Sequence, residues 1–92
     1  MRFPESAQAS KAAFLLGKMA ADGGDRSKAV VWFETYLDEQ PKGSFAADAL
    51  NRLMSGYESL DRPAKARAAA ERYLEAQPEG PHADKARKIL DQ

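Results

Sequence analysis

Few residues of this chain could carry out catalysis or bind a metal ion. The sequence has 92 residues, no cysteine and a single histidine, His82. A transition-metal site needs several imidazole, thiolate or carboxylate ligands held close together, and one histidine in a polar turn does not supply them. His82 is therefore predicted to be a solvated surface residue, and neither a metal nor another cofactor is expected.

The serines offer no nucleophile that a neighbouring base would activate. A serine hydrolase needs a histidine or another base beside the hydroxyl group, and no serine here has a plausible base next to it. Most of them stand where helices are predicted to begin or end, which is where serine caps backbone groups. The "DGGD" stretch at 22–25 lacks the lysine and the Ser or Thr of a phosphate-binding loop. We therefore expect a protein that is not an enzyme.

The charge balance narrows the possible partners. Fourteen basic residues match fourteen acidic ones, and neither half of the chain is biased. Nucleic-acid-binding proteins usually present a basic surface, so no nucleic-acid partner is expected. No apolar run approaches the roughly 18 residues that cross a membrane, so no membrane span is expected either.

The elements that hold these side chains are predicted to be helices. Alanine, leucine, lysine, glutamate and arginine dominate, apolar residues recur at helical spacing, and no alternating run of β-branched residues indicates a strand. We predict an all-α chain with five helices, near 6–21, 25–39, 44–59, 62–76 and 81–91. The apolar stripe of the first helix is predicted to be Ala9, Ala12, Ala13, Leu16 and Ala20.

Glycine and proline mark the predicted helix ends. Gly23 or Gly24 is expected to end the first helix in the left-handed conformation, and Pro63 fits the first turn of the fourth helix. Ser6, Gly43 and Gly80 occupy matching positions before the first, third and fifth helices, where they are predicted to be N-caps.

The chain repeats itself at a constant interval of 37 residues. Pro4, Pro41 and Pro78 show this interval, and several alanines and leucines follow it. A helix pair that recurs at a fixed period cannot bury its apolar face alone, so neighbouring pairs must stack. The chain begins inside one unit and ends after a first helix. We therefore expect about two and a half repeats of a longer array within one domain over 1–92; the alternative is a naturally short protein that starts at Met1.

The pattern within each unit resembles the tetratricopeptide repeat. The residues that carry the resemblance are Leu16, Gly17, Ala20, Ala29, Phe33, Tyr36 and Pro41 in one unit and Leu53, Tyr57, Ala66, Tyr73 and Pro78 in the next. The usual unit has about 34 residues, so this one is longer. Met54 stands where glycine is typical, and Ala70 stands where phenylalanine is typical.

The longer connection, "P-x-G-x-x-A-x-x-A", resembles the variant found in periplasmic envelope proteins. Among these are the coordinator associated with the Tol-Pal system and the lipoprotein of the outer-membrane β-barrel assembly machine. The resemblance implies a right-handed superhelical stack of antiparallel helix pairs. It also favours a periplasmic or envelope-associated location.

The resemblance further implies a concave groove lined by residues of the first helix of each pair. The groove positions would be Lys11, Phe14, Lys18, Asp48, Asn51, Arg52, Ser55, Lys85 and Lys88. Asn51, Arg52 and Lys85 could bind a peptide backbone or a carboxylate. The alternative is that these residues form ordinary helix surface.

Four residues outside the groove positions are candidates for an interface: Leu15, Trp32, Ile89 and Leu90. Phe14 and Leu15 are apolar where their counterparts Asn51 and Arg52 are polar, so they either form a groove pocket or contact a preceding repeat. Trp32 is either partly packed or an interface anchor. Ile89 and Leu90 are expected to be exposed at the last helix, which favours a homo-oligomer formed through exposed repeat ends.

These observations predict a non-catalytic protein–protein interaction module. Its groove would hold a peptide or a segment of a partner protein. The alternative function is a structural spacer or oligomerisation element of an envelope or signalling protein, acting through its ends.

Overall fold

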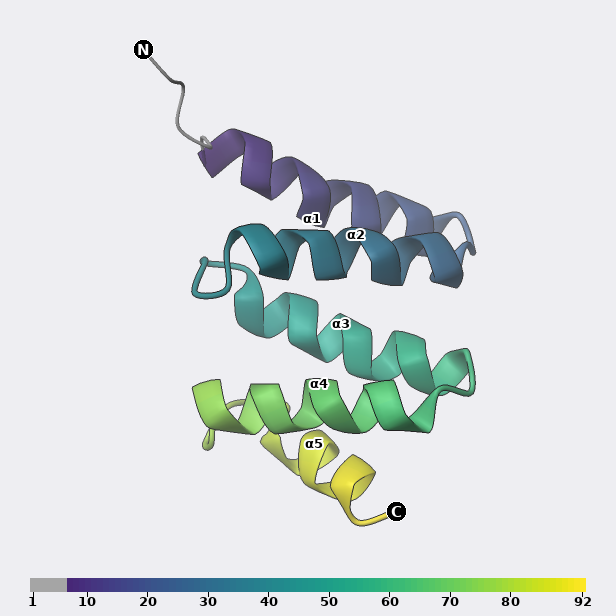
Figure 1. Ribbon diagram of the computed structural model, residues 1–92, viewed down its shortest axis with the longest axis vertical. Coiled ribbons are helices and arrows are strands. Elements are labelled where there is room, and N and C mark those ends of the chain that lie inside the picture. The colour runs from purple at the N-terminus through teal and green to yellow at the C-terminus, as the bar shows by residue number, and fades with distance from the viewer. Residues whose placement is uncertain (1–6) are drawn as a thin grey trace.

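The computed structural model describes residues 7–92, with side chains for residues 11–92, and this part of the chain forms five α-helices (Figure 1). They are α1 (Ala7–Asp22), α2 (Arg26–Glu39), α3 (Ala46–Ser59), α4 (Pro63–Ala76) and α5 (Ala83–Leu90). The predicted all-α class and the five helices are confirmed. The expectations for Pro4, Ser6 and the side chain of Ala9 lie outside the described residues.

The helices run alternately in opposite directions and pack one after another, so the molecule is a flat stack (Figure 1). Its dimensions are 48 × 29 × 19 Å. Extensive packing occurs between helices that are adjacent in the sequence. The stack therefore has two different ends, one formed by α1 and the other by α5.

The two tight helix–helix turns use different residues for the same backbone conformation. Gly24 follows α1 with a φ of 86°, as predicted, and the Asp25 carboxylate then accepts a hydrogen bond of 3.0 Å from the backbone N–H of Lys28. Asp61 takes the equivalent left-handed conformation after α3, with a φ of 59°. Aspartate tolerates this region better than most residues. Pro63 opens α4 in its first turn, as predicted.

The longer connections differ from the prediction. Gly43 and Gly80 are not N-caps, because α3 and α5 begin at Ala46 and Ala83, directly after Phe45 and His82. Neither of those side chains caps its helix.

A tyrosine hydroxyl from the preceding helix takes the place of a side-chain cap. The Tyr36 hydroxyl accepts a hydrogen bond of 3.0 Å from the backbone N–H of Phe45, and the Tyr73 hydroxyl accepts one of 3.1 Å from the backbone N–H of His82. A Cβ atom at Gly43 or Gly80 would press on that same hydroxyl. Glycine is therefore required by the close approach of the tyrosine.

Small residues also stand where helices cross closely. Ala29 and Ala66 are buried, and so are the large residues Phe33 and Tyr57. A Cβ atom at Gly17 of α1 would lie 2.6 Å from a ring carbon of Phe33 in α2. The first helix pair therefore depends on a glycine facing a phenylalanine ring.

Two predictions about the ends of the stack are wrong. Ala12 and Leu16 were placed in the packing stripe of α1, yet both are exposed, because no described helix covers that side of α1. Ile89 was expected to be exposed, yet it is only 4% exposed, and Leu90 packs against the core. The helix α5 turns its apolar face onto α4, so the end predicted to be open is closed.

We expect Gly17→Ala to destabilise the protein. The added Cβ must displace the Phe33 ring, and overpacking of this kind costs about 1–3 kcal/mol, which outweighs the roughly 0.5–1 kcal/mol that alanine gains in a helix. The melting temperature should fall by several degrees. Gly23→Ala is the matched control, because its Cβ would meet the nearest atom at an ordinary 3.5 Å. Equal melting temperatures for the two variants would contradict this account of the α1–α2 crossing.

A double-mutant cycle tests the tyrosine–glycine contact. Gly80→Ala should cost about 1–3 kcal/mol because its Cβ meets the Tyr73 hydroxyl, and Tyr73→Phe should cost about 0.5–1.5 kcal/mol through the lost hydrogen bond. The double variant should cost less than the sum, since phenylalanine lacks the obstructing oxygen. Chemical denaturation measures each free energy of unfolding, and the Gly43 and Tyr36 pair should repeat the result. If the two changes in the free energy of unfolding are strictly additive in both pairs, the proposed contact between the glycine position and the tyrosine hydroxyl is ruled out.

Candidate functional site

An aromatic cluster lies beneath the predicted groove positions of α1 and α3. It consists of Phe14, Phe33, Tyr36 and Phe45. The Phe14 ring stacks on Phe45 with ring centroids 4.7 Å apart, and it is tilted against Phe33 at 5.6 Å and Tyr36 at 5.7 Å. Phe14 is only 2% exposed. Both interpretations of Phe14 are therefore wrong: it neither opens a groove pocket nor faces a preceding repeat, because its ring closes the core between α1, α2 and the turn before α3.

Three cationic side chains lie over the rings of this cluster. The Arg52 guanidinium carbon is 5.8 Å from the centroid of Phe14 and 5.9 Å from that of Phe33. The ammonium groups of Lys18 and Lys11 lie 5.9 Å from Phe14 and 5.8 Å from Phe45, respectively. Attraction between a cation and a ring face is worth roughly 0.5–1 kcal/mol at exposed sites. The rings therefore favour positions of these three positive charges over their faces.

One carboxylate accompanies these cations. Asp48 Oδ1 accepts a hydrogen bond of 3.1 Å from Arg52 Nε, one helical turn along α3. Both side chains remain more than one-third exposed, so the pair contributes little to stability. The pair's main effect is to hold the guanidinium group over Phe14 and Phe33.

A second group of predicted residues joins α3 to α5. The Lys85 ammonium group donates a hydrogen bond of 2.7 Å to Asn51 Oδ1 and others to the Ser55 hydroxyl and the Asn51 carbonyl oxygen. Burial lowers the pKa of Lys85 below its ordinary value of 10.5, and the charge of Glu58 partly opposes that shift. Asn51 and Lys85, which were expected to contact a peptide, bind each other here.

Two hollows flank the Lys85 hydrogen bonds. One has a volume of about 320 Å³ and lies between α2, α3 and the end of α1; it is lined by Ala21, Arg26, Ala29, Val30, Phe33, Asn51, Arg52, Ser55, Gly56 and Ser59. The other, of about 330 Å³, is lined by Glu58, Asp84, Lys85, Lys88, Ile89 and Gln92. The face between α1, α3 and α5 is therefore uneven and partly hollowed, with cationic side chains at both hollows.

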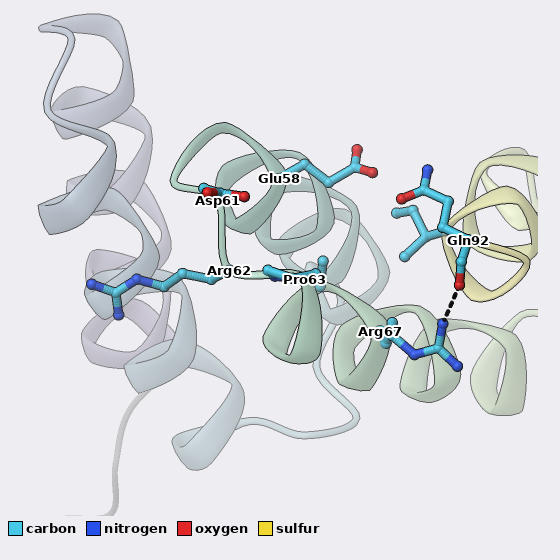
Figure 2. A pocket seen from close by; sticks show the side chains of 8 residues that line it. Glu58, Asp61, Arg62, Pro63, Arg67 and Gln92 are labelled. Carbon is cyan, nitrogen blue, oxygen red and sulfur yellow. Dashed lines mark hydrogen bonds between the residues drawn. The ribbon is translucent and has the colours of Figure 1, made fainter.

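A third hollow of about 220 Å³ occupies the place in the second unit that the 320 Å³ hollow has in the first (Figure 2). Pro63, Ala66 and Arg67 stand 37 residues after Arg26, Ala29 and Val30. Arg67 donates hydrogen bonds to the backbone oxygens of Leu90 at 3.2 Å and Gln92 at 3.0 Å. Because a cation bound to the last carbonyls stabilises a helix end, this hollow has a structural role.

Sequence reasoning missed Arg67. The available signal was a charged residue where the preceding unit has Val30, which is buried. A polar residue at a position that is apolar in the neighbouring repeat indicates a different local partner, here the end of α5.

The remaining predicted residues lie away from the aromatic cluster. Leu15 is 44% exposed. Trp32 is half-buried and packs against the core, which agrees with the packing interpretation. His82, predicted to be a solvated surface residue, is half-buried, and its ring lies edge-on to Tyr73 with centroids 5.9 Å apart.

Two other kinds of site are absent from the described part of the chain. No group of three or more histidine, cysteine, aspartate or glutamate residues there is arranged to hold a metal ion. None of the described helices has the length and apolar character needed to cross a membrane.

The chain matches no protein-family model, no curated protein and no solved structure.

The lowered pKa of Lys85 predicts a pH-dependent contribution to stability. As the pH rises toward 10.5, the folded chain loses the Lys85 proton before the unfolded chain does, so the unfolded state binds more protons and stability rises. The parent should therefore gain stability relative to Lys85→Met across this alkaline window, and below it the difference should be constant. Urea denaturation at a series of pH values measures it, with the exposed Lys88→Met as control. A stability difference between the parent and Lys85→Met that does not change with pH would contradict the lowered pKa of Lys85.

Proposed function

We propose that this chain is a non-catalytic protein-interaction module of the tetratricopeptide type. The resemblance of Gly17, Phe33 and Tyr36 in one unit, and of Tyr57, Ala66 and Tyr73 in the next, to that repeat supports the proposal. The two long connections support it too, since each pairs a tyrosine hydroxyl with the helix that follows it. In such a module the helix pairs form a right-handed superhelix, and α1, α3 and α5 line its concave side.

The partner in this proposal is an extended protein segment that carries carboxylate groups. The observation behind it is the cationic face, which we define as Lys11, Lys18, Arg52 and Lys88. These residues come from α1, α3 and α5, and they lie over the aromatic cluster or beside the two flanking hollows. Ammonium and guanidinium groups form short, strong hydrogen bonds with carboxylates. Asp48, Glu58 and Asp84 offset part of this charge.

The proposed mechanism is presentation of fixed charges. Lys11, Lys18 and Arg52 are held over aromatic rings, so less side-chain freedom is lost when a partner binds. Complementary charge mainly raises the association rate and sets specificity. The resemblance to envelope proteins favours a location of the proposed module in the periplasm or at the envelope.

A labelled oligoglutamate peptide is a direct probe of the cationic face. Fluorescence anisotropy should detect weak, salt-sensitive binding to the parent chain. Lys11→Glu with Lys18→Glu should weaken that binding at least tenfold, because it reverses two charges and leaves the Arg52–Asp48 pair in place.

The matched control reverses two charges on the second helices. Lys28→Glu with Arg72→Glu makes the same change in net charge on exposed residues of α2 and α4. Binding to this variant should stay within about threefold of the parent, which is a small change in binding free energy. Equal loss in both variants, or no binding by the parent, would refute an acid-binding face. Circular dichroism checks that both variants fold.

A further inference from the structure

The hollow of about 320 Å³ between α2, α3 and the end of α1 has a positively charged lining. Arg26 and Arg52 line it, and none of its described lining residues is an aspartate or a glutamate. Arg52 donates its Nε–H to Asp48, which leaves its two terminal nitrogens without a hydrogen-bond partner in the described chain. Arg26 takes part in neither of the ion pairs of the described residues. Two guanidinium groups with unused N–H donors therefore stand at this hollow.

The neutral polar side chains of the hollow have unused donors as well. Lys85 donates hydrogen bonds to Asn51 Oδ1 and to the Ser55 hydroxyl oxygen. Asn51 therefore keeps its amide N–H groups, and Ser55 keeps its hydroxyl hydrogen, for another acceptor. The polar part of the lining is thus complementary to a group that has acceptor atoms only.

The matching hollow of the second unit contains carboxylates of its own. Its lining includes two arginines and two acidic residues, Arg62, Arg67, Glu58 and Asp61 (Figure 2). Ala21 and Gly24 stand 37 residues before the two acidic residues, so the first unit lacks both carboxylates. Arg52 stands 37 residues before the apolar Ile89, so the first unit also gains a positive charge there. The first hollow therefore has an excess of positive charge that the second does not have.

The floor of the hollow is apolar. Ala29, Val30 and Phe33 line it, and all three are buried. The Arg52 guanidinium carbon lies 5.9 Å from the centroid of the Phe33 ring, so positive charge stands directly beside this apolar floor. The volume of about 320 Å³ lies in the range of binding pockets, which combine apolar walls with a few placed polar groups.

We propose that this hollow receives an apolar side chain of the partner segment, with the carboxylate of an adjacent residue between Arg26 and Arg52. The inference rests on the proposed function, because the hollow joins the cationic face at Arg52. A carboxylate has acceptor atoms only, and guanidinium groups bind it through paired N–H donors. A side chain of the size of leucine beside it would cover Val30 and Phe33. The hollow therefore selects segments in which an apolar residue adjoins an acidic one, rather than unbroken acidic runs.

Two labelled peptides test this selection. One is an octamer of glutamate, and the other has leucine at its fourth position; both have blocked ends, so that no terminal carboxylate takes part. The leucine peptide carries one charge fewer, so recognition of charge alone would weaken its binding. The parent should instead bind it about fivefold more tightly or better, because leucine leaves water in the hollow. Fluorescence anisotropy measures both affinities, and the preference should remain at high salt, which screens exposed charges.

Two variants change the hollow and leave the cationic face intact. Arg26→Glu should abolish the preference for the leucine peptide, since it removes one of the two groups that hold the adjacent carboxylate. Ala21→Leu should abolish it without a change of charge, because the larger side chain fills the hollow from the end of α1. Lys28→Glu is the matched control for Arg26→Glu: it makes the same change of charge on an exposed residue of α2 outside the hollow, and the preference should stay. Oligoglutamate binding should stay within about threefold of the parent in all three variants.

The possible outcomes separate this inference from the proposed function. Binding of oligoglutamate with no preference for leucine would overturn the role of the hollow and leave the cationic face in place. A preference that persists in both Arg26→Glu and Ala21→Leu would mean that leucine binds elsewhere, and it would also overturn the inference. Binding of the leucine peptide alone would support the hollow and refute the cationic face, and binding of neither peptide would overturn both. Circular dichroism checks that each variant folds.

Discussion

The hydrogen bond from a backbone N–H to a tyrosine hydroxyl organises the rest of this structure. Tyr36 and Tyr73 accept the N–H group that precedes α3 and α5, a group that helix geometry leaves without a partner inside the helix. Each bond ties the end of one helix pair to the start of the next, and the glycine beside it lets the tyrosine approach. Because this contact sets the position of Phe45, it also places the ring on which Phe14 stacks.

The candidate site depends on that placement. Phe14 and Phe45 form the surface over which Lys11, Lys18 and Arg52 lie, and the position of α5 brings Lys85 to Asn51 and Ser55. The charged residues therefore stand where the stacking of the helices puts them. A change of register at either connection would move apart site residues that come from different helices, although each helix would remain intact.

Local features of the fold could be predicted from the sequence, while the partner of each face could not. Helical spacing, Gly24 and Pro63 act within a few residues, so the helices were predicted nearly to their ends. The prediction that Leu16 is packed failed because the repeat pattern identifies a helix face that is buried only when another helix covers it. No described helix covers that face of α1. The prediction for Ile89 failed for the opposite reason: repeat register alone did not show that α5 packs its apolar side onto α4 and presents Arg87 and Asp91 outward. In the site, the repeat register brought Asn51, Ser55 and Lys85 together correctly, but it could not show that they would bind one another.

The cationic face and the exposed apolar residues of α1 border each other. Lys11, Leu15 and Lys18 follow one another at one-turn spacing, so Leu15 lies beside the cations that stand over the aromatic cluster, whereas Leu16 and Met19 lie farther round the helix. Arg52 and Lys88 are supplied by α3 and α5. A partner segment that contacts all four cations must therefore cross three helices. The spacing of the helices in the stack, rather than any single lysine, then decides which arrangement of carboxylates fits the face.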